Sequence, residues 1–159
     1  MRAATLDDAH VLARHRIAMF TDMGVPLDAP ELDKAFRAWL ATTMPAGTYR
    51  AWLADTIDGQ VAAGGGITII PWPPGPRYPG DRLAFVYNVY TEPAHRRRGL
   101  AKLIMETIHG WCREHDIGST ALNSSPEGKP LYEAMGYAET PNPMMFFAVA
   151  EYNPTAQDA

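Results

Sequence analysis

The spacing of hydrophobic residues predicts helices at the start of the chain. Apolar residues recur every three or four positions between Val11 and Met19, which predicts an amphipathic helix that ends near Gly24. A second stripe of the same spacing predicts a helix from Pro30 to Thr43, since proline is tolerated in a first helical turn. Two helices are therefore expected before the first long strand.

Hydrophobic and polar residues alternate from Thr48 to Ala54, which predicts a strand. Asp58-Gly59 has the composition of a tight turn, and the apolar, β-branched run from Val61 to Ile70 predicts an antiparallel partner strand. Three glycines, Gly64 to Gly66, interrupt this run. They predict a β-bulge, or a place where another group approaches the backbone closely.

The rest of the chain alternates strands and helices after a proline-rich connection, Pro71 to Gly80. Its five prolines cannot donate backbone hydrogen bonds, so we expect an exposed, stiff loop that borders a pocket or a subunit contact. Beyond it we expect a buried strand at Leu83–Thr91, a long helix from Leu100 that Gly118 terminates, a short strand at Thr120–Asn123, a short helix from Ser125 that ends before Gly136, and a last strand or strand pair near Tyr137–Ala138 and Met144–Ala150.

The composition bounds the class of protein. A length of 159 residues predicts one domain over residues 1–159, and the net charge of −4 excludes a general nucleic-acid binder, so any phosphate site must be local. The single cysteine, Cys112, excludes an intramolecular disulfide and favours a cytoplasmic protein. The histidines show no metal-ligand pattern, so no metal is expected. The start is acidic and no apolar run approaches ~20 residues, so we expect neither export nor a membrane span.

The segment with the clearest chemistry joins the strand ending at Thr91 to the long helix. It places Arg96, Arg97 and Arg98 directly before Gly99, where the helix begins. Backbone N–H groups at a helix start lack helical partners, the helix dipole is positive there, and arginines add charge-assisted donors. The segment therefore predicts a site for a diphosphate. The alternative is a solvated basic turn.

The sequence from Arg96 to Ala101, Arg-Arg-Arg-Gly-Leu-Ala, resembles the Arg/Gln-x-x-Gly-x-Gly/Ala signature of the GNAT acetyltransferase superfamily. A second segment, from Leu122 to Tyr137, is similar to the later strand, short helix and Leu-Tyr-x-x-x-Gly-Phe ending of that family. The resemblance is sharp over about Leu83 to Tyr137 and architectural before it. It implies a mixed α/β fold, in which a mostly antiparallel twisted sheet with splayed central strands is flanked by about four helices.

The resemblance also implies a binding site for an acyl-coenzyme A, most often acetyl-coenzyme A (acetyl-CoA). The pantetheine arm would pair with one strand, the phosphates would bind the arginine-rich turn, and the short strand that follows would form the other wall. Carried over by position, the binding residues are the backbone groups of Val89 and Tyr90 for pantetheine and the amides of Arg97, Arg98, Gly99, Leu100 and Ala101 for the pyrophosphate. The side chains of Arg96, Arg98 or Lys102 would reach the outer phosphates, and Asn123 and Ser125 would line the other wall.

Tyr132, in the Leu-Tyr motif, is the catalytic residue that the resemblance implies. A phenol with a pKa of about 10 can protonate a thiolate whose conjugate acid has a pKa of about 8.5, so Tyr132 is expected to act as general acid on the leaving group.

The sequence does not select a general base. Phe85 stands where some relatives carry a glutamate, which departs from a histone-acetyltransferase-like mechanism. Other candidates lie near strand ends or in the early helices, and no spacing favours one of them: Asp22, Glu31, Asp81, Glu92 and His95.

The function expected from the resemblance is an N-acetyltransferase that transfers an acetyl group from acetyl-CoA to a primary amine of a small molecule or peptide by direct attack. The alternatives are a non-catalytic acyl-CoA sensor and a purely structural interaction domain. The resemblance and the apolar last strands also allow a homodimer. The acceptor stays open, because its pocket would come from the early helices and loops that match the family least.

Overall fold

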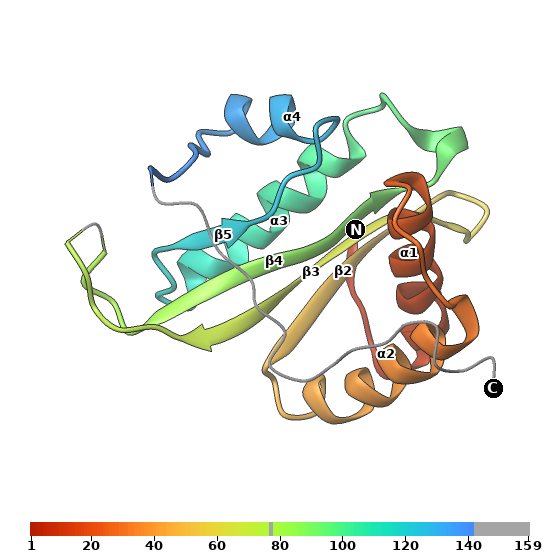
Figure 1. Ribbon diagram of the computed structural model, residues 1–159, viewed down its shortest axis with the longest axis horizontal. Helices are drawn as coiled ribbons and strands as arrows, with labels where there is room; N and C mark the ends of the chain where they lie inside the picture. Colours follow the sequence, from red (N-terminus) through yellow and green to blue (C-terminus); the bar gives the residue numbers. More distant parts are fainter. Residues whose placement is uncertain (77, 142–159) are drawn as a thin grey trace. The chain divides into compact units, whose positions relative to one another are not determined.

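The computed structural model describes residues 1–76 and 78–141, and the chain divides into two compact units, Met1–Asn123 and Ser124–Ala159. Within these described residues, the first unit contains a five-stranded sheet with three α-helices, and the second contains one α-helix (Figure 1). In chain order the elements are β1 (Arg2–Ala3), the 3-10 turn η1 (Leu6–Asp8), α1 (Ala9–Asp22), α2 (Ala29–Thr43), β2 (Tyr49–Asp55), β3 (Val61–Pro71), β4 (Arg82–Thr91), the 3-10 turn η2 (Pro93–His95), α3 (Leu100–Glu114), β5 (Thr120–Leu122) and α4 (Lys129–Ala134).

The strands follow the order β1-β2-β3-β4-β5 across the sheet, and every neighbouring pair is antiparallel except β4 and β5, which are parallel. This mixed, mostly antiparallel architecture confirms the expected fold class. Met144–Ala150, part of the expected last strand pair, lies outside the described residues. Tyr137–Ala138 is not a strand, because the Tyr137 amide donates to the Tyr132 carbonyl (3.0 Å) and closes the end of α4.

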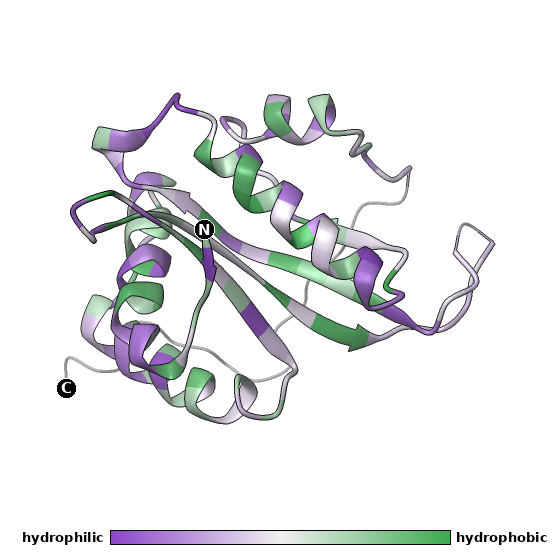
Figure 2. Ribbon diagram, turned by 180° about the vertical axis from the view of Figure 1, so that it is seen from behind, coloured by the Kyte–Doolittle hydropathy of each residue, from purple (hydrophilic) through white to green (hydrophobic). Residues whose placement is uncertain are grey.

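Successive side chains of β2 point to opposite faces of the sheet, and each face is covered by different helices. Tyr49 and Leu53 face α1 and α2, where they pack in one cluster with Leu12 and Leu40. Trp52 faces the other way and packs against Trp111 of α3, with ring centroids 5.9 Å apart. The hydrophobic end of β3 is visible in Figure 2 as a run of apolar residues. The sheet is thus buried on both faces, and α1 and α3 approach β4 from opposite sides.

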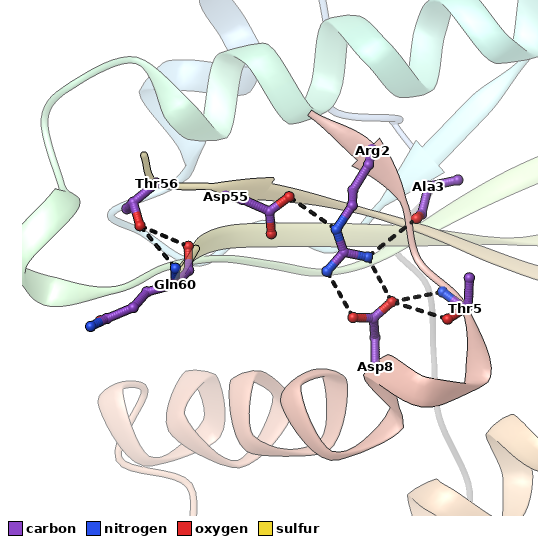
Figure 3. Close-up of polar contacts among 7 residues, drawn as sticks. All are labelled: Arg2, Ala3, Thr5, Asp8, Asp55, Thr56 and Gln60. Atoms are coloured by element: carbon purple, nitrogen blue, oxygen red, sulfur yellow. Dashed lines mark hydrogen bonds and ion pairs between the residues drawn. The ribbon is translucent and has the colours of Figure 1, made fainter. Parts of the chain in front are cut away.

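The first strand, β1, was not expected from the sequence, because two residues are too few to show an alternating pattern. The guanidinium of Arg2 holds it in place: two of its N–H groups donate to Asp8, each at 2.8 Å, and Nε donates to Asp55 at 2.9 Å (Figure 3). The same arginine lowers the pKa of the Asp8 carboxyl. These contacts fix the start of α1 against the edge of β2.

The glycine run marks a β-bulge, as expected, but the extra residue belongs to the partner strand. Gly64 pairs with Tyr90 and Gly66 with Tyr87, so two steps along β3 match three steps along β4. Asn88 of β4 takes the left-handed conformation (φ 54°) at this point. The close approach to the backbone is also present: a Cβ on Gly65 would lie 2.6 Å from Ile104 Cγ2 of α3.

The described residues of the proline-rich loop between β3 and β4 are largely exposed, as expected, and its tyrosine attaches the loop to the segment that follows α3. The Gly118 amide donates to Tyr78 Oη at 2.8 Å, and the Tyr78 ring lies against the Cα of Gly118. Gly118 therefore makes room for Tyr78 rather than ending α3, which stops at Glu114. The left-handed residue that follows the helix is Asp116 (φ 55°).

Candidate functional site

The two parallel strands separate halfway along β4. Their last Cα pair joins Val86 to Leu122, where β5 ends, whereas β4 continues to Thr91. Val89 and Tyr90, the residues expected to pair with pantetheine, lie in this continuation. Asn123, expected on the opposite wall, directly follows β5. The structure therefore shows the strand separation that the resemblance implied.

The turn after β4 exposes backbone N–H groups at the start of α3. Gly99 is the N-cap of this helix with φ 79°, a conformation that glycine adopts without a steric penalty, and no described atom lies within 4 Å of where its Cβ would be. The Leu103 amide donates to the Gly99 carbonyl at 3.0 Å, so the amides of Leu100, Ala101 and Lys102 precede the intrahelical hydrogen bonds. An open backbone with unpaired donors at a positive helix end fits a diphosphate.

Arg96 braces this turn. Its Nη2 forms an ion pair with Asp22 at the end of α1, and its Nε donates to the Thr91 carbonyl at 3.0 Å. The guanidinium also lies 5.6 Å from the centroid of the Tyr90 ring. In this conformation Arg96 connects the turn to α1 and β4. The sequence resemblance had instead assigned its side chain to an outer phosphate.

The remaining cations of the turn are exposed. Arg97 takes a left-handed conformation (φ 62°), and neither Arg97 nor Arg98 makes an ion pair within residues 1–76 and 78–141. Lys102 lies 3.6 Å from Glu106 on the same helix. Arg97, Arg98 and Lys102 thus place three exposed cations beside the start of α3.

A buried histidine links α1 to the end of β4. His15 is 1% exposed, and its Nε2 lies 3.1 Å from Oε1 of Glu92, a carboxylate that also pairs with Arg14. The His15 ring lies beside Tyr90, with centroids 5.1 Å apart. Burial and the charge of Arg14 lower the pKa of His15 to about 4, so the imidazole is neutral at pH 7. Glu92 and Asp22, two candidate bases, are thus both paired with arginines.

The buried neutral His15 predicts a specific loss of stability in acid. Protonation of His15 favours the unfolded chain, so its contribution is present above about pH 6.5 and is lost as the pH falls toward 4. The loss amounts to about 3 kcal/mol below pH 4. Thermal unfolding of the wild type and of His15→Gln, measured from pH 7 to 4, is expected to give a shallower decline in the variant. Parallel declines would contradict this role for His15.

Comparison with known proteins identifies the family. The sequence model of the acetyltransferase (GNAT) family matches residues 14–137 of this chain. The chain belongs to this family. It is also similar to the solved structure of a GCN5-related N-acetyltransferase from Ralstonia eutropha, with 33% identity over 92% of this chain and 96% of that chain and a TM-score of 0.82.

Two further solved structures share the fold of this acetyltransferase. A predicted acetyltransferase with acetyl-CoA from Clostridium acetobutylicum has a TM-score of 0.84 and 24% identity over 92% of this chain and 94% of its own. Glucosamine-6-phosphate N-acetyltransferase from Arabidopsis thaliana has a TM-score of 0.64 and 18% identity over 92% and 95% of the two chains. None of the curated proteins compared with this chain matches it.

Family membership makes the chain an acetyltransferase, and the GNAT family uses acetyl-CoA. The amides and open glycine at the start of α3 are suited to the diphosphate of such a molecule. In the part of the chain that the structure describes, no three potential metal ligands gather in one place. Its described helices include none that is both long and apolar enough to cross a membrane.

The second unit contains the other two expected site residues of the acetyltransferase. Ser125 closes the turn that leads into α4, since its Oγ accepts from the Gly128 amide at 3.1 Å and its carbonyl from the Lys129 amide at 3.0 Å. The Tyr132 ring meets that of Tyr137 edge to face, with centroids 5.8 Å apart. Burial, followed by the neighbouring Tyr137, raises the pKa of the Tyr132 phenol to about 12.

Sequence reasoning missed the polar group that the bulge places on the α1 side of β4. The Asn88 Oδ1 accepts from Arg16 Nη1 of α1 at 2.7 Å, and Asn88 is 7% exposed. Two signals were present: an arginine within the apolar stretch of the first helix, and an asparagine within the apolar run of β4. Neither belongs to the family motifs that directed attention to the turn.

Proposed function

We propose that this acetyltransferase transfers the acetyl group of acetyl-CoA to a primary amine of a small molecule or peptide by direct attack. The observation that carries the proposal is the start of α3, where Gly99 and the free amides follow a strand that has separated from β5. The 33% identical protein from Ralstonia eutropha, a GCN5-related N-acetyltransferase, supports the choice of nitrogen as the acceptor atom.

The donor supplies an acetyl group activated as a thioester. We propose that β4 backbone groups at Val89 and Tyr90 bind the pantetheine arm as an added strand would bind. The amides from Arg97 to Ala101 would hold the pyrophosphate, and the exposed Arg98 and Lys102 side chains would bind outer phosphates. Arg96 would hold the turn in shape through Asp22, and Asn123 and Ser125 would contribute the other wall.

We propose Tyr132 as the general acid. As the neutral amine nitrogen bonds to the acetyl carbonyl carbon, the carbon–sulfur bond breaks and the sulfur receives the proton of the Tyr132 phenol. The proton that the amine nitrogen loses passes to water, and water returns a proton to Tyr132. A phenol with a pKa of about 12 stays protonated at neutral pH, so the Tyr132 O–H is present to stabilise the departing sulfur. Oxyanion stabilisation would come from a backbone N–H of β4 near the strand separation.

The two units would act as one transferase domain over residues 1–159. The family match from 14 to 137 spans both units, which supports this hypothesis. The single cysteine, Cys112, is a buried free thiol, which suits the reducing cytoplasmic location that we propose. A homodimer stays a hypothesis that light scattering of the purified chain tests.

Two measurements test the proposed function. Coenzyme A is expected to raise the midpoint of thermal unfolding, and a panel of primary amines is expected to release free thiol from acetyl-CoA at rates that depend on the amine. Stabilisation by coenzyme A without any amine-dependent thiol release would support the acyl-CoA sensor. The absence of stabilisation would support the structural interaction domain and overturn the proposal.

A further inference from the structure

The side chain of Arg16 lies in an aromatic environment on the α1 side of the sheet. Its Cζ is 4.9 Å from the ring centroid of Phe20 and 4.9 Å from that of Phe36, which belongs to α2. Its Nη1 donates to Asn88 at the β4 bulge, and Tyr49 and Tyr87 also lie within its electrostatic reach. Arg16 is half-buried, and Tyr49 beside it is 1% exposed.

This guanidinium lacks a counter-ion among the residues that the structure describes. Arg2, Arg14 and Arg96 each pair with a carboxylate, whereas Arg16 makes a single hydrogen bond to a neutral amide within that same part of the chain. Four of the five N–H groups of its guanidinium are left without a described hydrogen-bond partner. A half-buried cation without an anion is costly, and an apolar side chain would pack more favourably between two phenylalanines.

Arg16 lies next to the part of β4 that is proposed to bind the pantetheine arm of the donor. Its partner Asn88 immediately precedes Val89, in the part of β4 that continues after β5 has ended. On the same side of β4 the rings of Phe85 and Tyr87, with centroids 4.8 Å apart, are half-buried. A molecule that entered from the α1 side would therefore meet a cation and aromatic rings next to the strand proposed to hold pantetheine.

We propose that Arg16 binds a carboxylate of the acceptor, so that the preferred acceptors are amines that also carry a carboxylate, as amino acids do. The planar guanidinium matches a carboxylate through two parallel hydrogen bonds, and the aromatic rings exclude water around the pair. Asn88 holds the guanidinium in place through its oxygen. This inference rests on the proposed function and names the substrate class of the same site.

The kinetic test compares amino acids with their primary amides, which keep the amine and side chain and lose the negative charge. Alanine, leucine, phenylalanine and glutamate with their α-amides serve as probes. In the wild type, kcat/KM is expected to be at least about tenfold higher for the acid, since hydrogen bonds to a charged group are the strong ones. Arg16→Gln is expected to lower this ratio at least about tenfold relative to the wild type, and Arg16→Lys to restore part of it.

The acid-to-amide ratio of kcat/KM is compared between enzyme variants. The amine of an amino acid and the amine of its amide differ in intrinsic reactivity, and this difference cancels in the comparison. Arg37→Gln is the matched control, because it removes an exposed arginine of α2 that lies 3.6 Å from Asp33. It is expected to leave the acid-to-amide ratio unchanged. An equal ratio in the wild type and Arg16→Gln would overturn the proposal.

A binding measurement separates this inference from the proposed function. In calorimetric titrations, N-acetylphenylalanine is expected to bind the wild type at least about tenfold more tightly than its amide, and Arg16→Gln is expected to lose the difference. Acetylation of amines without any acid preference would overturn the role of Arg16 and leave the proposed function standing. Arg16-dependent binding of the acid without turnover of any amine would overturn the proposed function and leave the carboxylate site.

The stability of Arg16→Met distinguishes a binding arginine from a structural one. This variant removes the unpaired charge and keeps most of the side-chain volume, so its thermal midpoint is expected to equal or exceed that of the wild type. A clear drop in the midpoint together with an unchanged acid preference would show that Arg16 only connects α1 to β4, and would overturn the proposal.

Discussion

Gly99→Asp is expected to weaken the binding of coenzyme A on the order of 100-fold while leaving the fold intact. A carboxylate at this position would lie at the free amides of α3 and would repel the diphosphate, which removes several charge-assisted hydrogen bonds. Aspartate tolerates the left-handed conformation better than most residues and suits a helix N-cap. The measurement is calorimetric titration with coenzyme A beside thermal unfolding.

The matched control for Gly99→Asp is Gly47→Asp. Gly47 also has a left-handed backbone (φ 70°) and lies between α2 and β2, and the nearest atom to its Cβ position is Arg50 Nη2 at 3.6 Å. The control adds the same side chain and charge to the same kind of backbone, and coenzyme A affinity is expected to stay within about twofold of the wild type. Equal affinities for both variants would place the phosphates elsewhere.

Tyr132→Phe is expected to lower turnover about 100-fold, the lower end of what general acid catalysis contributes, and to leave coenzyme A affinity unchanged. Burial raises the pKa of Tyr132 to about 12, so the acid form persists and the wild-type rate is expected not to decline as the pH passes 10. Steady-state thiol release from pH 6 to 11 measures turnover and its pH dependence, and calorimetric titration measures the affinity for coenzyme A.

Tyr137→Phe provides the matched control for this substitution. Tyr137 contacts the Tyr132 ring edge to face and stands where the family ending has phenylalanine, so its replacement is expected to keep most of the activity. Unchanged turnover of Tyr132→Phe at every pH would remove Tyr132 from the mechanism.

Elements with a long periodic pattern could be predicted from the sequence, and those that depend on pairing could not. The stripes of α1, α2 and α3 and the alternation in β2 reflect burial of one face, which a local pattern records. The two-residue strand β1 exists because Arg2 reaches Asp8 and Asp55, which are distant from one another in sequence.

In the candidate site, too, features that are local in sequence could be predicted, and contacts between distant residues could not. The arginine-rich turn could be predicted because a helix start, a glycine and cations are adjacent in sequence. The brace between Arg96 and Asp22 and the contact between Arg16 and Asn88 join residues more than seventy positions apart. The bulge that turns Asn88 toward α1 depends on pairing with β3, which the sequence of β4 alone does not contain.

The most direct test of the proposed function follows the acetyl carbon. The full chain is incubated with acetyl-CoA labelled with carbon-13 at the carbonyl and with an amine acceptor, and the products are read by NMR and mass spectrometry. The account predicts that the label appears in the amide of the acetylated amine, with one amide formed for each thiol released. Thiol release with the label in free acetate, at a rate that does not depend on the amine, would contradict it.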